Sequence, residues 1–231
     1  MELRAILSAN AGVCLCLGGQ KVWVDALHRH SVSGFSSVDE GLFDSWMASF
    51  AVRAPDAICY THCHPDHFSK DLTLLATKEY PNARLFLPEK MFDWQELVAG
   101  ECFEANLGAL QLRFIKLPHE GEQYRDCLHY GILITAGDKR ILIPGDCRLT
   151  DAALANAISG LDIDVALLDF PWLTLNKSKA FVATHIRPKN VILYHLPFEK
   201  DDVNGYLSSA RRCGDGIKLL CEPMQEIIME I

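Results

Sequence analysis

The chain has 231 residues, of which 49% are hydrophobic and 23% charged, an ordinary composition for a soluble globular protein. Its formal net charge of −8 argues against a broad basic surface for gripping nucleic acid, and no apolar run approaches the length of a membrane span. We therefore expect a single domain over residues 1–231 that acts on a small molecule, with no nucleic-acid or membrane partner and with homo-oligomerisation left open.

The cysteines and the N-terminus indicate a reducing compartment. Nine cysteines are scattered along the chain, odd in number and without a CxxC pair, which does not suggest a disulfide framework. The first residues, Met1 to Arg4, do not open a secretory signal. We expect a cytoplasmic protein.

The first half of the chain begins with strands and then alternates strands with helices. Gly18-Gly19-Gln20 predicts a hairpin turn, and residues 28–37 are polar and read as a loop. In the helix that follows, Phe43, Trp46 and Phe50 are spaced to share one buried face. The predicted strands are 4–7, 13–17, 21–25 and 57–60, and the predicted helices are about 39–52 and 71–80.

The second half repeats this pattern. Pro88-Glu89 suits a helix start, and Gly137 suits a second hairpin. The order fits two sheets packed face to face with helices outside, but it also fits one mixed sheet, and periodicity alone does not decide. The predicted strands are 84–87, 110–117, 130–136, 140–144, 165–170 and 191–194, with a closing strand pair at 218–221 and 226–230; the predicted helices are 150–159, 178–186 and 201–213.

The most informative segment is residues 61–68, Thr-His-Cys-His-Pro-Asp-His-Phe, which directly follows an apolar strand. His62, His64, Asp66 and His67 are four metal-competent side chains within six positions. Alternation in an extended segment places His62 and His64 on one face, and Pro65 biases the backbone before it toward an extended conformation. This pattern predicts a divalent metal site.

Three later residues of ligand type also follow apolar strands, where functional loops commonly lie. They are His119 after Leu117-Pro118, Asp146 after Pro144-Gly145, and His195 after Tyr194. His129 competes with His119 for its role, and His185 competes with His195. We favour His119 and His195 because each stands at the exit of a predicted strand.

This ordered set of residues resembles the metallo-β-lactamase superfamily over about residues 3–231. The resemblance implies a four-layer αββα sandwich with two mixed β-sheets, outer helices and a two-metal site at one edge. It implies that His62, His64 and His119 bind the first metal, that Asp66, His67 and His195 bind the second, and that Asp146 bridges both. Asp66 and Asp146 are then the catalytic carboxylates.

Two metals about 3.5–4 Å apart would hold a bridging hydroxide near neutral pH, which attacks the substrate. We expect two divalent ions, with zinc favoured and manganese, iron or nickel also compatible with nitrogen and oxygen ligands. Departures from several relatives narrow the reaction: Leu-Pro-His-Glu replaces the Gly-His-Thr of glyoxalase II–like thioesterases, and no flavodoxin segment follows. The chain is most similar to the branch containing ascorbate-6-phosphate lactonase.

We therefore expect a binuclear metal-dependent hydrolase of a small, anionic ester, lactone or phosphodiester. A nuclease or phosphodiesterase acting on short nucleic acid is one alternative, and a non-catalytic metal-binding sensor protein is another. Asp25 is assigned equally to a role in orienting a ligand histidine and to a simple turn. Candidate substrate contacts are His28, His30, His129 and Trp172, while Cys63 and Cys147 are expected to serve packing.

Overall fold

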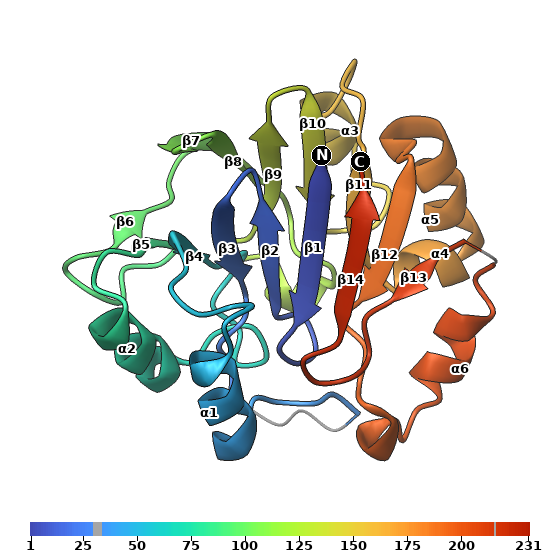
Figure 1. The fold of residues 1–231 in the computed structure, drawn as a ribbon. Helices are drawn as coiled ribbons and strands as arrows, with labels where there is room; N and C mark the ends of the chain where they lie inside the picture. Colours follow the sequence, from blue (N-terminus) through green and yellow to red (C-terminus); the bar gives the residue numbers. More distant parts are fainter. Residues whose placement is uncertain (30–33, 215) are drawn as a thin grey trace.

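The computed structural model describes residues 1–29, 34–214 and 216–231. Its strands form two seven-stranded sheets that face each other, with helices on the outside (Figure 1). The αββα sandwich expected from the resemblance is confirmed.

The first sheet joins the first 97 residues of the chain to the C-terminal strand. Strands β3, β4, β5 and β6 run parallel, whereas β14, β1, β2 and β3 pair antiparallel. In spatial order the sheet consists of β14 (Glu226–Glu230), β1 (Glu2–Leu7), β2 (Val13–Leu17), β3 (Gln20–Val24), β4 (Ala57–Cys59), β5 (Arg84–Leu87) and β6 (Glu96–Leu97).

The second sheet has the same mixed character. Strands β10 to β13 are parallel neighbours, and β7 to β10 form an antiparallel meander. In spatial order it consists of β13 (Lys218–Leu219), β12 (Asn190–Tyr194), β11 (Val165–Asp169), β10 (Lys139–Ile143), β9 (Tyr130–Ala136), β8 (Leu110–Lys116) and β7 (Cys102–Leu107).

Helices cover the outer face of each sheet. Over the first sheet, Trp46 of α1 packs edge-on against Trp23 of β3, with ring centroids 5.4 Å apart. The covering helices are α1 (Glu40–Ala48) and α2 (Lys70–Glu79) on the first sheet, and α3 (Ala152–Ala157), α4 (Pro171–Thr174), α5 (Asn176–Phe181) and α6 (Tyr206–Arg211) on the second. Short helical turns lie at η1 (Glu122–Tyr124), η2 (Val182–Ile186, a π-helical turn) and η3 (Glu199–Asp201).

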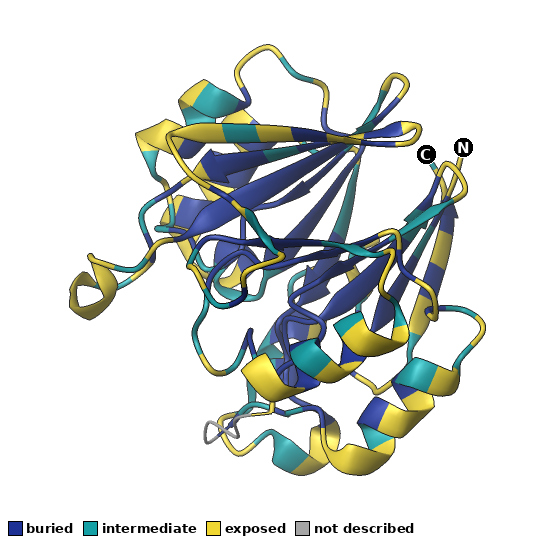
Figure 2. Ribbon diagram, turned by 90° about the vertical axis from the view of Figure 1, so that its left-hand side faces the viewer, coloured by how far each residue is buried: buried dark blue, intermediate teal, exposed yellow. Residues whose placement is uncertain are grey.

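The core has two parts that follow strand alternation in the second sheet. Ile141, Val165 and Ile192 point into the apolar layer shared with the first sheet. Leu142 and Ala166 point the other way, into a second apolar cluster under α3 to α6. Figure 2 shows the buried strands facing each other and the exposed outer faces of the helices. Each strand of this sheet therefore has a defined inner and outer face.

Three predictions about elements were wrong. In place of a helix after Pro88 the described chain forms a loop, because the Gln95 side chain accepts from the N–H groups of Met91 and Phe92, both at 2.7 Å, and donates to the carbonyl of Glu89. Phe50 is 77% exposed because α1 ends at Ala48.

The two closing strands also do not pair with each other. β13 lies beside β12 in the second sheet, whereas β14 lies beside β1 in the first. Both hairpins, at residues 18–20 and at Gly137, are confirmed.

Within the described residues, none of the helices combines the length and the apolar character that crossing a bilayer requires.

Candidate metal centre

Histidine and aspartate side chains gather at the carboxyl ends of strands from both sheets. They form three groups in which one ligand atom of each residue lies within 4.8 Å of the others. The groups are His62, His64 and His119; His62, His67 and Asp146; and Asp66, His67 and His195. The structure thus brings together both expected ligand triads, and Asp146 lies between them. That these residues bind metal stays a prediction.

The histidine motif leaves β4 in an extended conformation and then turns back on itself. The N–H groups of His67 and Phe68 donate to the carbonyl of His64 at 2.9 and 2.8 Å. The rings of His62 and His64 lie edge to face with centroids 4.5 Å apart. The tight turn brings the ring centroid of His67 to 4.0 Å from that of His62. One short segment therefore contributes residues to both triads.

Asp25 orients this motif from the end of β3. Its fully buried carboxylate accepts from the Thr61 N–H at 2.8 Å and the Thr61 hydroxyl at 2.6 Å. It also lies 3.0 Å from Nδ1 of His67. Thr61 in turn contacts Nδ1 of His62 at 3.0 Å. Asp25 therefore directs the Nε2 atoms of His62 and His67 toward the site, which decides between its two predicted roles.

Hydrogen bonds to backbone carbonyls fix the position of His119. Its Nδ1 donates to the carbonyl of Glu120 at 2.7 Å. The Glu120 N–H donates to the Asp146 carbonyl, and the Arg148 N–H to that of Pro118, at 2.8 and 2.7 Å. The two ligand-bearing segments are thus bonded to each other.

The donor set fits a cation. The Nε2 atoms of His62 and His119 are buried and have no hydrogen-bond partner among the residues that the structure describes. Leaving such atoms unpaired is costly, and a metal ion would satisfy both lone pairs.

The Asp146 carboxylate faces nitrogens of both triads. Its Oδ2 lies 3.3 Å from Nε2 of His67 and 3.8 Å from Nε2 of His119, and its Oδ1 lies 3.7 Å from Nε2 of His195. Gly145, at φ +61°, makes the turn that places it. This is the arrangement expected of an anionic bridge between two cations.

The pKa shifts of Asp146 and His67 are those expected of a site that binds a cation. Burial opposes ionisation of Asp146, but His67 and His195 outweigh it and hold its pKa well below the usual range. Burial also opposes protonation of His67, yet Asp146 and Asp25 raise its pKa well above the usual value. A proton on His67 therefore stands where a metal would bind, so metal uptake would release it.

His195 completes the second group in a strained conformation. Its φ is +55°, unusual for a residue with a side chain, and its N–H donates to the Asn10 carbonyl at 3.0 Å. Its Nε2 comes within 3.2 Å of Nε2 of His67. The competing His185 is exposed on η2 and belongs to none of the three groups found among the described residues.

Three of the four predicted substrate contacts are fully buried side chains. His28 is fully buried and its Nε2 bonds to the Ala9 carbonyl at 3.0 Å. Trp172 is fully buried in the cluster under the outer helices. His129 is fully buried and packs against both His62 and His119. These three side chains have no accessible surface, which argues against contact with a substrate. The four assignments stay predictions, and His30 lies outside the described residues.

The flanking cysteines behave as packing residues. Cys147 is buried, Cys63 packs against the main core, and burial raises the pKa of both thiols. A neutral thiol is a poor metal ligand.

Sequence reasoning missed an aromatic residue at the site. Tyr124, in η1, is 42% exposed, and its ring lies 4.8 Å from the rings of both His64 and His119. Only its place in the loop after His119 could have signalled it.

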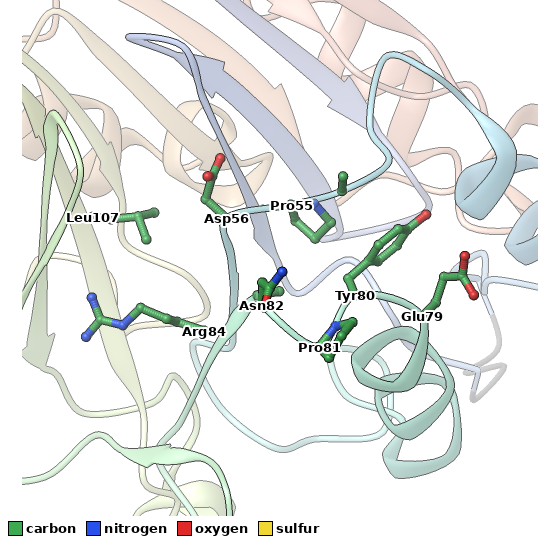
Figure 3. A pocket seen from close by; sticks show the side chains of 10 residues that line it. Pro55, Asp56, Glu79, Tyr80, Pro81, Asn82, Arg84 and Leu107 are labelled. Carbon is green, nitrogen blue, oxygen red and sulfur yellow. The ribbon is translucent and has the colours of Figure 1, made fainter.

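Two cavities differ in where they lie relative to the histidines. One of about 380 Å³ is lined by Asp56, Tyr80 and Arg84 at the amino ends of β4 and β5, the edge opposite the histidines (Figure 3). Another, of about 450 Å³, is lined by Glu120, Arg148 and Lys177, beside the segments that carry His119 and Asp146. Of these two cavities, the second lies beside the predicted metal centre.

Comparison with known proteins identifies the superfamily of this chain. A family model described as a beta-lactamase superfamily domain matches residues 48–201, about two thirds of the chain, and includes every predicted ligand. This chain belongs to the beta-lactamase superfamily. No curated protein matches it.

Solved structures share the superfamily fold at low identity. A metallo hydrolase, Igni18, from the archaeon Ignicoccus hospitalis is 16% identical with a TM-score of 0.67, and all of both chains is covered. The metallo-beta-lactamase fold protein YhfI from Bacillus subtilis is 12% identical with a TM-score of 0.66, covering 99% of each chain. CmlA, a diiron beta-hydroxylase from Streptomyces venezuelae, is 15% identical with a TM-score of 0.62, covering 99% of this chain and 54% of its own.

Proposed function

We propose that this protein is a binuclear metal-dependent hydrolase that cleaves a small ester, lactone or phosphodiester. The observation that carries the proposal is the position of Asp146. Its two carboxylate oxygens face His67, His119 and His195, which belong to both histidine groups. A sensor protein with one metal would not need a carboxylate between two ligand sets.

The ligands of the proposed centre divide as the resemblance implies. His62, His64 and His119 would hold one ion, Asp66, His67 and His195 the other, and Asp146 both. Two divalent ions bound there would supply a hydroxide nucleophile at neutral pH and polarise the bond under attack. Asp25 and Glu120 contribute by fixing which nitrogen of His67 and His119 faces the site.

We propose zinc as the metal, since three or more neutral imidazoles with carboxylates suit it. The diiron CmlA has the same fold, so iron is the competing identity. Metal analysis of protein purified without added metal distinguishes them.

The proposed substrate is small and anionic. Arg148 and Lys177 line the cavity beside the Asp146 segment, where they could bind a phosphate or carboxylate. The resemblance to the ascorbate-6-phosphate lactonase branch favours a lactone carrying such a group.

The test is hydrolysis by zinc-loaded protein of bis-p-nitrophenyl phosphate, p-nitrophenyl acetate, phenyl acetate and a panel of lactones. We expect turnover of at least one class, and loss of about 10²-fold or more in kcat with Asp146→Asn. Absence of turnover across the whole panel, with two metals bound, would contradict a hydrolase.

A further inference from the structure

A second carboxyl group stands at the same edge of the second sheet. Asp169 is the last residue of β11, and β11 lies between β10 and β12. Asp146 follows the end of β10, and His195 follows the end of β12. Because these three strands are parallel, their carboxyl ends meet at one edge. Asp169 therefore occupies the middle position between two predicted ligands.

Strand alternation turns its side chain inward. Val165 and Leu167 of β11 belong to the apolar layer between the sheets, whereas Ala166 and Leu168 belong to the cluster under the helices. Asp169 continues the inward series. Its register partner Tyr194 also points inward and directly precedes His195. The carboxyl thus faces the layer in which the histidines lie.

The environment of Asp169 disfavours the ionised form of its carboxyl group. Its Oδ1 is buried and has no hydrogen-bond partner in the described part of the chain. Burial and then the negative charge of Asp146 raise the pKa of Asp169 well above the usual range. Asp169 belongs to none of the three ligand groups found among the described residues.

Asp164, at the other end of β11, is a buried aspartate with a structural role and allows a comparison. Asp164, just before β11, is also buried, but it accepts from the Arg140 N–H at 2.9 Å and from Lys189 at 2.8 Å. These partners lower its pKa. Asp164 is paired, whereas the buried Oδ1 of Asp169 has no partner among the described residues. The fold alone does not explain a carboxyl left in that state.

We propose that Asp169 is the proton donor to the leaving group in the hydrolysis proposed above, on which this inference rests. As water oxygen bonds to the carbonyl carbon or phosphorus, the bond to the leaving oxygen breaks and its electron pair stays on that oxygen. The Asp169 O–H proton moves to the leaving oxygen, which departs as a hydroxyl group. The attacking water gives up one proton to solvent, and Asp169 regains one before the next turnover.

The dependence on the leaving group tests this role. p-Nitrophenolate leaves without a proton, whereas the more basic phenolate needs one. With Asp169→Asn we expect kcat on phenyl acetate to fall ~10²-fold and kcat on p-nitrophenyl acetate to fall by less than about threefold. Metal content and Tm of the variant should match those of the wild type. An equal loss on both esters at full metal content would overturn the inference.

Asp164→Asn is the matched control. It removes a buried carboxylate from the other end of β11, so it should lower Tm while leaving the ratio of the two rates unchanged. A changed ratio in this variant would show that the effect does not belong to Asp169 and would also overturn the inference.

Infrared spectroscopy separates this inference from the proposed function. The difference spectrum of zinc-loaded wild type minus Asp169→Asn at neutral pH should contain a protonated carboxyl stretch. Its absence would refute the role of Asp169 whatever the enzyme hydrolyses. Its presence in a protein that hydrolyses none of the panel would support a protonated Asp169 and contradict the hydrolase instead.

Discussion

At the scale of single residues, the site depends on buried side chains that themselves hold no metal. Asp25 bonds to Thr61 and His67, and through Thr61 it reaches His62. Such partners fix the ring orientation and the tautomer of each ligand before a metal arrives.

Asp25→Asn should therefore weaken metal binding. An amide cannot accept from Thr61 and His67 as the carboxylate does, so we expect zinc affinity to fall about 10–100-fold in a chelator competition assay. Asp56→Asn is the control, because Asp56 also accepts from a backbone N–H, that of Lys21 at 2.8 Å, but at the opposite end of β4. Equal affinities for Asp25→Asn and wild type would refute the orienting role.

His28 makes stability depend on pH. Burial is the main cause that lowers its pKa from 6.5 to about 4, against a smaller opposing effect of the Ala9 carbonyl. The unfolded chain binds a proton that the folded chain excludes, so stability present above pH 6.5 is lost as the pH falls toward about 4. The loss should be about 3 kcal/mol.

The check is urea unfolding of wild type and His28→Gln across this window. Glutamine can still donate to Ala9 but does not titrate, so the free energy of unfolding should fall less steeply with acid in the variant. Titration of the other histidines is common to both proteins. Parallel curves would contradict the assignment.

At the scale of elements, the turn after β10 places Asp146. Gly145 has φ +61°, and a Cβ there would lie 2.7 Å from Nε2 of His129 and 3.2 Å from Cβ of Thr61. His129, predicted as a substrate contact, instead fills the space beneath this turn. The loop has its shape because glycine permits both the dihedral angle and the close packing.

Gly145→Ala should lower the free energy of unfolding by about 2–4 kcal/mol, because a strained backbone and a steric clash add together. Gly137→Ala is the matched control: Gly137 also has φ +61°, but a Cβ there meets no atom of the described residues within 4 Å. We expect about 1 kcal/mol for the control. Similar losses in the two variants would show that His129 and Thr61 move aside freely.

At the scale of the whole molecule, the site joins the two sheets. His62, His64, Asp66 and His67 follow β4 of the first sheet, whereas His119, Asp146 and His195 follow strands of the second. Metals held by both sets would stabilise the folded state only.

Saturating zinc should therefore raise Tm relative to chelator-treated protein. At 100 times Kd the gain is about 2.7 kcal/mol, or roughly 5–10 °C for a chain of this size. Because metal must displace the proton that Asp146 and Asp25 hold on His67, the gain should be larger at pH 8 than at pH 6. Calorimetry at both pH values measures it, and a Tm insensitive to zinc at pH 8 would exclude the proposed centre.

The sequence by itself determined which histidines and aspartates are predicted ligands, their order, and most strands and helices. Those signals are local: His62, His64, Asp66 and His67 lie within six residues, and alternation reports which strands are buried. Even the fold came from the ordered ligands through a family resemblance, since periodicity left one sheet or two open.

Only the tertiary structure decided how distant segments meet. It separated the last two strands into different sheets, buried His28, His129 and Trp172, gave Asp25 its partners, and set Asp169 between Asp146 and His195. Burial and hydrogen-bond partners depend on contacts between residues far apart in the chain, and no local pattern of residue types encodes them.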